Sequence, residues 1–287
     1  MAVAFRMDKN KSKLSMWLPL ALIALVGLSL GIISCNESKA ESNTDEVKEA
    51  TLTKVLYVTH EPGKWHKYTP QKESFINLAK AQKWDLTIIS GTHDEVIKKL
   101  STSPNFADGF DVVVYNFCFA KCADLNVPYN IITQTKEKGI PAMLVHCSLH
   151  SFWPTYKEKG GNAVHAPGAH KKAHARKDLV EQWNKAHPDK QFPSWPTFTG
   201  IASVRHGPKT PIDVKKLDAD HAIVKDVPEY MTVNAELYDN FITADDSKST
   251  RAILKGVQGK SDSVVLWEHP VGKSKVISFT LGHGSEE

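Results

Sequence analysis

Residues 54–60 read Lys-Val-Leu-Tyr-Val-Thr-His, a short apolar run that ends on a histidine. Residues 141–146 (Pro-Ala-Met-Leu-Val-His) and 275–283 (Lys-Val-Ile-Ser-Phe-Thr-Leu-Gly-His) end in the same way. If these runs are parallel strands of one sheet, their histidines meet at its carboxyl edge, where an open α/β fold leaves a crevice for a ligand. Imidazole carries protons or binds metals near neutral pH, so the pattern predicts chemistry or coordination there.

The segments between these runs alternate between strand and helix patterns. Residues 86–90 and 111–115 are further strand candidates, and the second is apolar on both faces, as a central parallel strand is under two helical layers. Apolar residues recur at helical spacing in 71–83, 93–100 and 130–138. Strands separated by single helices predict a right-handed, doubly wound parallel sheet.

The alternation of strand and helix patterns ends after residue 150. Residues 152–211 are rich in Pro, Gly, Trp and His, with one expected helix near Lys177 to Lys185, so we expect a loop-rich insertion that lines or covers a site. Short strands are expected again at 212–217, 241–243, 264–267 and 276–279, with a helix or turn near Pro228. One domain over 52–287 contains both halves.

The amino-terminal segment has the pattern of a secretory signal. Four basic residues precede the apolar stretch 17–33, and residues 32–35 (Ile-Ile-Ser-Cys) look like a bacterial lipobox. We therefore expect 1–34 to be a lipoprotein signal peptide, Cys35 to carry the lipid, and 35–51 to be a flexible tether in the cell envelope, in the periplasm or at the outer membrane. An uncleaved membrane anchor is the alternative.

Charge and cysteine content exclude several classes of function. Without residues 1–34, Lys+Arg falls from 36 to 32 and Asp+Glu from 32 to 31, a net charge of +1, so composition gives no argument for nucleic acid as a partner. Apart from the lipidated Cys35, three cysteines remain, which is not a disulfide framework. The sequence leaves the oligomeric state open.

Several short motifs in a fixed order carry a resemblance to a known family. They are Thr59-His60, the turn at His146, Phe198-Thr-Gly leading to His206, Asp220-His221-Ala-Ile, Glu236-Leu-Tyr238, Trp267-Glu-His269-Pro and Gly282-His283. This set resembles the ThuA-like family, named for trehalose utilisation, over roughly residues 54–284. The resemblance implies a three-layer, flavodoxin-like fold of the class I glutamine amidotransferase type, with a mostly parallel central sheet, and a role in disaccharide or keto-sugar metabolism.

The turn after residues 142–145 carries His146 where glutamine amidotransferases place their nucleophilic cysteine. Cys147 follows one position later, so we expect its side chain to be buried and to point away from the cleft. Amidotransferase chemistry needs a thiolate paired with a histidine at that turn, so the sequence argues against this activity.

The candidate site combines imidazoles with one carboxylate. His146, His150, Glu236 and His283 supply ligand types that suit zinc or a similar divalent metal, and His146 and His150 are one helical turn apart. We expect His146, Glu236 and His283 to be catalytic in a metal- or histidine-assisted hydrolase, lyase or isomerase of a sugar derivative. A metal-free acid–base pair of His146 and Glu236, or a polar network without catalysis, remains open.

Substrate contacts are expected from His60, Trp65, His206 and Tyr238. Aromatic faces bind the apolar faces of sugars, although a tryptophan is more often a packing residue. The alternative function, from a different class, is a non-catalytic surface lipoprotein that binds a small carbohydrate. The sequence does not select the sugar or the reaction.

Overall fold

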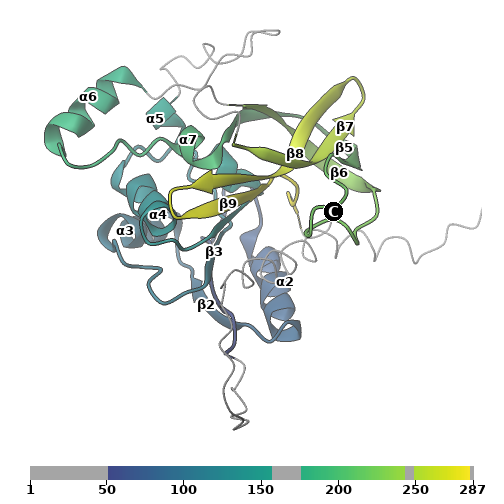
Figure 1. Ribbon diagram of the computed structural model, residues 1–287, viewed down its shortest axis with the longest axis horizontal. Helices are drawn as coiled ribbons and strands as arrows, with labels where there is room; N and C mark the ends of the chain where they lie inside the picture. Colours follow the sequence, from purple (N-terminus) through teal and green to yellow (C-terminus); the bar gives the residue numbers. More distant parts are fainter. Residues whose placement is uncertain (1–50, 157–175, 243–248, 285–287) are drawn as a thin grey trace, which may run out of the picture.

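The computed structural model describes residues 51–156, 176–242 and 249–284, which form a nine-stranded sheet with helices on its faces (Figure 1). The strands lie in the order β2-β1-β3-β4-β9-β8-β7-β5-β6. Their bounds are β1 Lys54–Val58, β2 Asp85–Ile89, β3 Val112–Tyr115, β4 Ala142–Val145, β5 Ile201–Lys216, β6 Tyr230–Ile242, β7 Arg251–Gln258, β8 Ser261–Val271 and β9 Ser274–Phe279. The helices are α2 Tyr68–Ala81, α3 His93–Thr102, α4 Asn126–Lys136, the 3₁₀ helix η1 His146–His150, α5 Trp153–Tyr156, α6 Lys177–Ala186 and α7 Trp195–Thr199.

The first half of the sheet is parallel, as the sequence predicts. β1 pairs with β2 and β3, β3 with β4, and β4 with β9, all in parallel. Successive residues of these strands point to opposite faces, so both faces must be covered. Phe75 and Leu78 of α2 belong to the cluster on one face, while α3 and α4 contribute Val96 and Ile131 to the cluster on the other. Figure 1 shows α2 on one side of these strands and α3 and α4 on the other.

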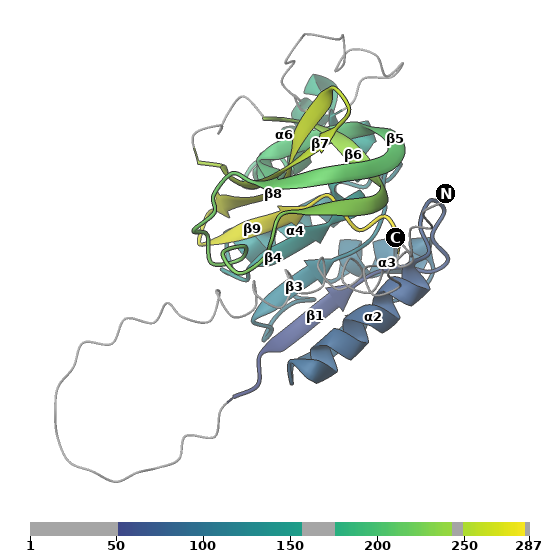
Figure 2. The same cartoon turned by 90° about the vertical axis from the view of Figure 1, so that its right-hand side faces the viewer.

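The second half corrects the expectation of a mostly parallel sheet. β9 to β8, β8 to β7, β7 to β5 and β5 to β6 are all antiparallel pairs, and Figure 2 shows these long strands above the parallel ones. The flavodoxin-like description therefore fits only the parallel half. The expected strands were too short because polar residues alternate with apolar ones in β5 and β6, which is the pattern of an antiparallel strand with one solvated face.

The stretch expected to be a loop-rich insertion contains regular structure at both ends. It holds α5, the expected helix as α6, and α7, while β5 already begins at Ile201. No helix within the described ranges is both long and apolar enough to cross a membrane. The signal peptide, the lipidated Cys35 and nearly all of the tether lie outside the described residues, so these stay predictions.

Candidate functional site

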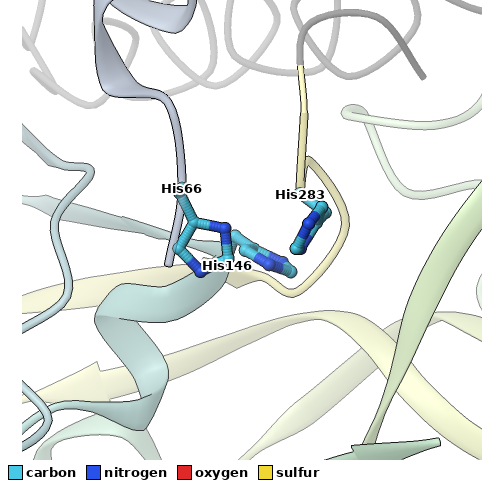
Figure 3. Close-up of side chains that lie close together, drawn as sticks. All are labelled: His66, His146 and His283. Carbon is cyan, nitrogen blue, oxygen red and sulfur yellow. The ribbon is translucent and has the colours of Figure 1, made fainter. Parts of the chain in front are cut away.

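Three histidines from distant parts of the chain converge at the carboxyl edge of the parallel strands. His66 comes from the loop between β1 and α2, His146 opens η1 directly after β4, and His283 follows β9 (Figure 3). One ring nitrogen of each lies within 4.8 Å of the others. His66 and His146 are buried, and the His283 side chain is 19% exposed. Two of the three residues are therefore the strand-tip histidines that the sequence predicts to meet.

His146 is held in place by its backbone and by one hydrogen bond. Its φ of 46° lies in the left-handed region, which a non-glycine residue adopts rarely and often at functional sites. The sharp turn after β4 is thus at His146, as expected from the sequence. The Nδ1 atom lies 2.6 Å from the carbonyl oxygen of Thr280 and donates to it, so Nε2 is the nitrogen without a proton in the neutral ring.

The other two histidines depend on close contacts of their loops. A Cβ atom on Gly63 would lie 2.1 Å from the carbonyl oxygen of His66, so only glycine allows this loop to close. The Gln71 side chain of α2 donates hydrogen bonds of 3.1 Å to the carbonyl oxygens of Gly282 and His283. Asn116 donates in turn to Gln71 over 2.8 Å. These contacts fix the segment that presents His283.

The antiparallel hairpin of β5 and β6 delivers a carboxylate to the histidines. In β6 the side chains of Ala235 and Leu237 enter the core, so Glu236 and Tyr238 point to the opposite face. Glu236 Oε2 lies 3.2 Å from His283 Nδ1 and 3.6 Å from His146 Nε2. Its other oxygen, Oε1, lies 3.6 Å from Nε2 of the half-exposed His206 on β5.

The protonation states of these groups follow from burial and from their neighbours. Burial, with His146 and His283 adjacent, lowers the pKa of His66 from 6.5 to about 3. Burial also lowers the pKa of His146, although Glu236 acts in the opposite direction. Burial alone would raise the pKa of Glu236, but His146 and His283 outweigh it and hold that pKa below its usual range. His66 and His146 are therefore neutral near pH 7 and lie close to an ionised carboxylate.

Three ring nitrogens lack a well-formed hydrogen bond in this arrangement, although Glu236 lies close to two of them. Nδ1 of His66, Nε2 of His146 and Nδ1 of His283 are buried and make no hydrogen bond with any described residue. The Nε2 lone pair of His146 is directed at a carboxylate oxygen, which is unfavourable unless a cation lies between them. The donor set of three imidazoles and a carboxylate is one that zinc and similar divalent ions prefer. The residues thus fit a metal ion.

The cluster opens into a cavity of about 370 Å³. Its wall is lined by Trp65, His66, Cys118, Ala120, Cys147, His150, Trp153, Arg205, His206, Glu236, Tyr238 and His283. Three of the four predicted substrate contacts, Trp65, His206 and Tyr238, are in this set. Trp65 is 56% exposed, whereas Tyr238 is buried under the other side chains.

Two predicted site residues lie beside the three-histidine cluster. The His150 ring lines the cavity but stacks on Tyr238 at 3.8 Å, and its Nε2 is 2.7 Å from Ser203 Oγ. Because η1 is a 3₁₀ helix with three residues per turn, the four-residue spacing does not align His146 with His150 as an α-helix would. His60 is buried away from the cavity wall, where its Nε2 accepts a hydrogen bond from the Cys118 amide.

Cys147 is buried, as the sequence predicts, but it belongs to the cavity wall and does not point away from the cleft. The prediction placed Cys147 beyond the turn, whereas the residue lies within the tight η1 turn that follows β4. Interaction with Cys118 and burial both raise the pKa of Cys147 above its usual range.

His66 is the site residue that the sequence interpretation missed. It lies in the loop after β1, six positions beyond the strand-tip His60, and the first strand ends at the same sheet edge as β4 and β9. That placement was the available signal, since every loop at this edge can reach the crevice. Gln71 and Thr280, which hold the cluster, carry no sequence signal of their own.

No protein-family model matches the sequence, and no curated protein matches it. Solved structures do resemble the fold. A protein named as ThuA-like from Bacteroides uniformis superposes with a TM-score of 0.54 at 14% identity, over 87% of this chain and 88% of that one. A second protein named as ThuA-like, from Parabacteroides merdae, gives a TM-score of 0.54 at 12% identity, over 81% and 80%. The chain therefore has the fold of these ThuA-like proteins.

Proposed function

We propose that this chain is a ThuA-like protein that uses a divalent metal, zinc or a similar ion, to transform a sugar derivative. The shared fold and the ordered motifs support the family, and the family suggests carbohydrate as the substrate class. Both proposals concern the same cavity, because Glu236, Tyr238, His206 and His283 belong to the motifs and also line its wall.

One observation carries the metal proposal. His66, His146 and His283 each bring one ring nitrogen within 4.8 Å of the others, and each has a buried ring nitrogen without a well-formed hydrogen bond beside the carboxylate of Glu236. Leaving a buried polar atom unpaired costs about 1–3 kcal/mol. A metal ion bound there would use these lone pairs and balance the negative charge of Glu236.

The side chains around the cluster have separate roles in this proposal. His66, His146 and His283 would hold the ion, which would supply Lewis-acid polarisation when bound. Glu236 accepts a proton from the substrate or from water, because the carboxylate is ionised at neutral pH. His206 faces the other oxygen of Glu236 and is 44% exposed, so it carries the proton from Glu236 to solvent.

The rim of the cavity suits a sugar ring. Trp65 and Trp153 are both on the wall, and Trp65 presents much of its indole to solvent. Indole faces bind the apolar faces of sugars, and Arg205 at the rim is already paired with Asp239. A neutral glycoside or keto-sugar therefore fits better than an anionic substrate. The reaction class is hydrolysis, elimination or isomerisation of such a sugar.

The test is a set of variants assayed on disaccharides and their 3-keto forms, with and without chelator. His146→Ala should lose both metal binding and turnover. Glu236→Gln should keep metal binding and lose turnover, because the amide preserves the size of the side chain but cannot accept the proton. If Glu236→Gln loses the metal as His146→Ala does, Glu236 is a ligand and its role as base is wrong. Full turnover by His146→Ala would reject the proposed function.

A second candidate is a carbohydrate-binding protein without catalysis, anchored to the cell envelope through Cys35. The exposed Trp65 at the rim favours it, since stacking alone can bind a sugar. The same assays separate the two candidates. Sugar binding that is insensitive to chelator, dependent on Trp65 and unaccompanied by turnover would favour the binding protein.

A further inference from the structure

Two cysteines meet on the wall of the cavity and take no part in the proposed reaction. Cys118 follows β3 and Cys147 follows His146, so they come from neighbouring strand ends. Both are free thiols, both are buried, and both belong to one small apolar cluster with Tyr68 and Ala120. The two side chains lie together in this cluster and interact with each other.

We propose that Cys118 and Cys147 form a reversible disulfide that switches off the adjacent metal site. Interaction with the Cys147 side chain and with the Ala120 backbone lowers the pKa of Cys118 below its usual value, although burial acts in the opposite direction. The cavity beside the pair, about 370 Å³, admits a small peroxide. The pair therefore meets two requirements for oxidation, which are neighbouring thiols and access for the oxidant.

The oxidant is hydrogen peroxide, which supplies both oxidising equivalents. The Cys118 sulfur attacks one peroxide oxygen, the O–O bond breaks, and a sulfenic acid and one water form. The Cys147 sulfur then attacks the sulfenic sulfur, the S–O bond breaks, and a second water leaves as the S–S bond forms. The two thiols lose one hydrogen each, and the peroxide takes up the two electrons.

The effect on the metal site follows from the position of Cys147. A disulfide brings the sulfurs to about 2.05 Å, closer than two unbonded thiols approach, so the Cys147 side chain must move toward Cys118. His146 is the preceding residue, and its φ of 46° and its bond to Thr280 fix the direction of Nε2. Tyr238 also interacts with the Cys147 side chain, and the Tyr238 ring lies 4.7 Å from that of His146. Closing the disulfide therefore disturbs the immediate surroundings of a metal ligand.

Cys122 is a matched control within the same loop. It is buried to the same degree as Cys118 and is also a free thiol, but it does not line the cavity. Burial raises the pKa of Cys122 to about 11, so it is a poor nucleophile. Trypsin separates the two positions because Lys121 lies between them.

The first experiment treats the full-length protein with hydrogen peroxide, blocks free thiols and maps tryptic peptides without reduction. The expected result is a link between peptides 100–121 and 139–157 that dithiothreitol removes. Cys118→Ser and Cys147→Ser should abolish the link, whereas Cys122→Ser should retain it. Absence of the link in the wild type, or a link through peptide 122–136, would overturn the proposal.

The second experiment measures zinc-induced thermal stabilisation before and after oxidation; this part rests on the proposed function. Oxidised wild type should lose most of the zinc-induced rise in Tm, and oxidised Cys118→Ser should keep it. If zinc still raises the Tm of the oxidised, disulfide-linked wild type by the same amount, the proposed switch is refuted. If reduced wild type shows no rise, the metal proposal fails, while the peptide map still decides whether the disulfide forms.

Discussion

Replacement of His66 by alanine should remove most of the stabilisation that zinc gives to this protein. A ligand that binds only the folded state at 100 times its Kd stabilises that state by about 2.7 kcal/mol. For a domain of this size, one kcal/mol changes Tm by roughly 2–4 °C, so zinc should raise the Tm of the wild type by about 5–11 °C. His66 supplies one of the three unpaired nitrogens, so its loss should weaken binding strongly.

A loss of about 100-fold in affinity leaves zinc near its Kd, where the stabilisation is only about 0.4 kcal/mol and the rise in Tm about 1–2 °C. The assay is differential scanning fluorimetry with zinc and with chelator, in which each variant is compared with its own metal-free form. His93→Ala is the control, because His93 is partly exposed and outside the cluster. A full zinc-induced rise in His66→Ala, or none in the wild type, would refute the reasoning about this site.

Three further predictions test the surroundings of the site and the fold. Burial lowers the pKa of His60 from 6.5 to about 4. As the pH falls, the unfolded chain therefore binds this proton before the folded protein does. The free energy of unfolding should decline between pH 6.5 and pH 4, by on the order of 3 kcal/mol from this group. His60→Gln should flatten that decline in urea titrations, and an unchanged slope would assign it to other groups. In the same measurement, Gly272→Ala should lower the free energy of unfolding by about 1–3 kcal/mol more than Gly259→Ala does. Both residues have positive φ, but of these two only Gly272 would place a Cβ against the carbonyl oxygen of Lys136, at 2.3 Å. Equal losses of stability would contradict this contact. Trp65→Ala should raise the KM for a sugar substrate about tenfold without changing kcat or the zinc-induced rise in Tm, whereas a loss of kcat alone would place Trp65 in the chemistry instead.

The parallel half of the fold was predictable because its sequence signals are local. Residues 111–115 and 142–145 are apolar on both faces, and only a sheet covered on both sides buries such strands. The antiparallel half was harder to predict, since β5 and β6 alternate polar and apolar residues over long stretches interrupted by register shifts at Ser203, His206 and Pro211. Such strands are stabilised by pairing with each other, which no single segment reveals.

The sequence by itself determined that histidines at the ends of parallel strands meet at one edge of the sheet, because parallel strands all end on the same side. It determined His146 and His283 in this way, as well as the turn at His146. Only the tertiary structure decided that His66 completes the cluster in place of His60, and that Glu236 reaches it from the antiparallel hairpin. The physical reason is that loop closure and strand pairing between distant segments set those distances, and neither leaves a periodic pattern in the chain.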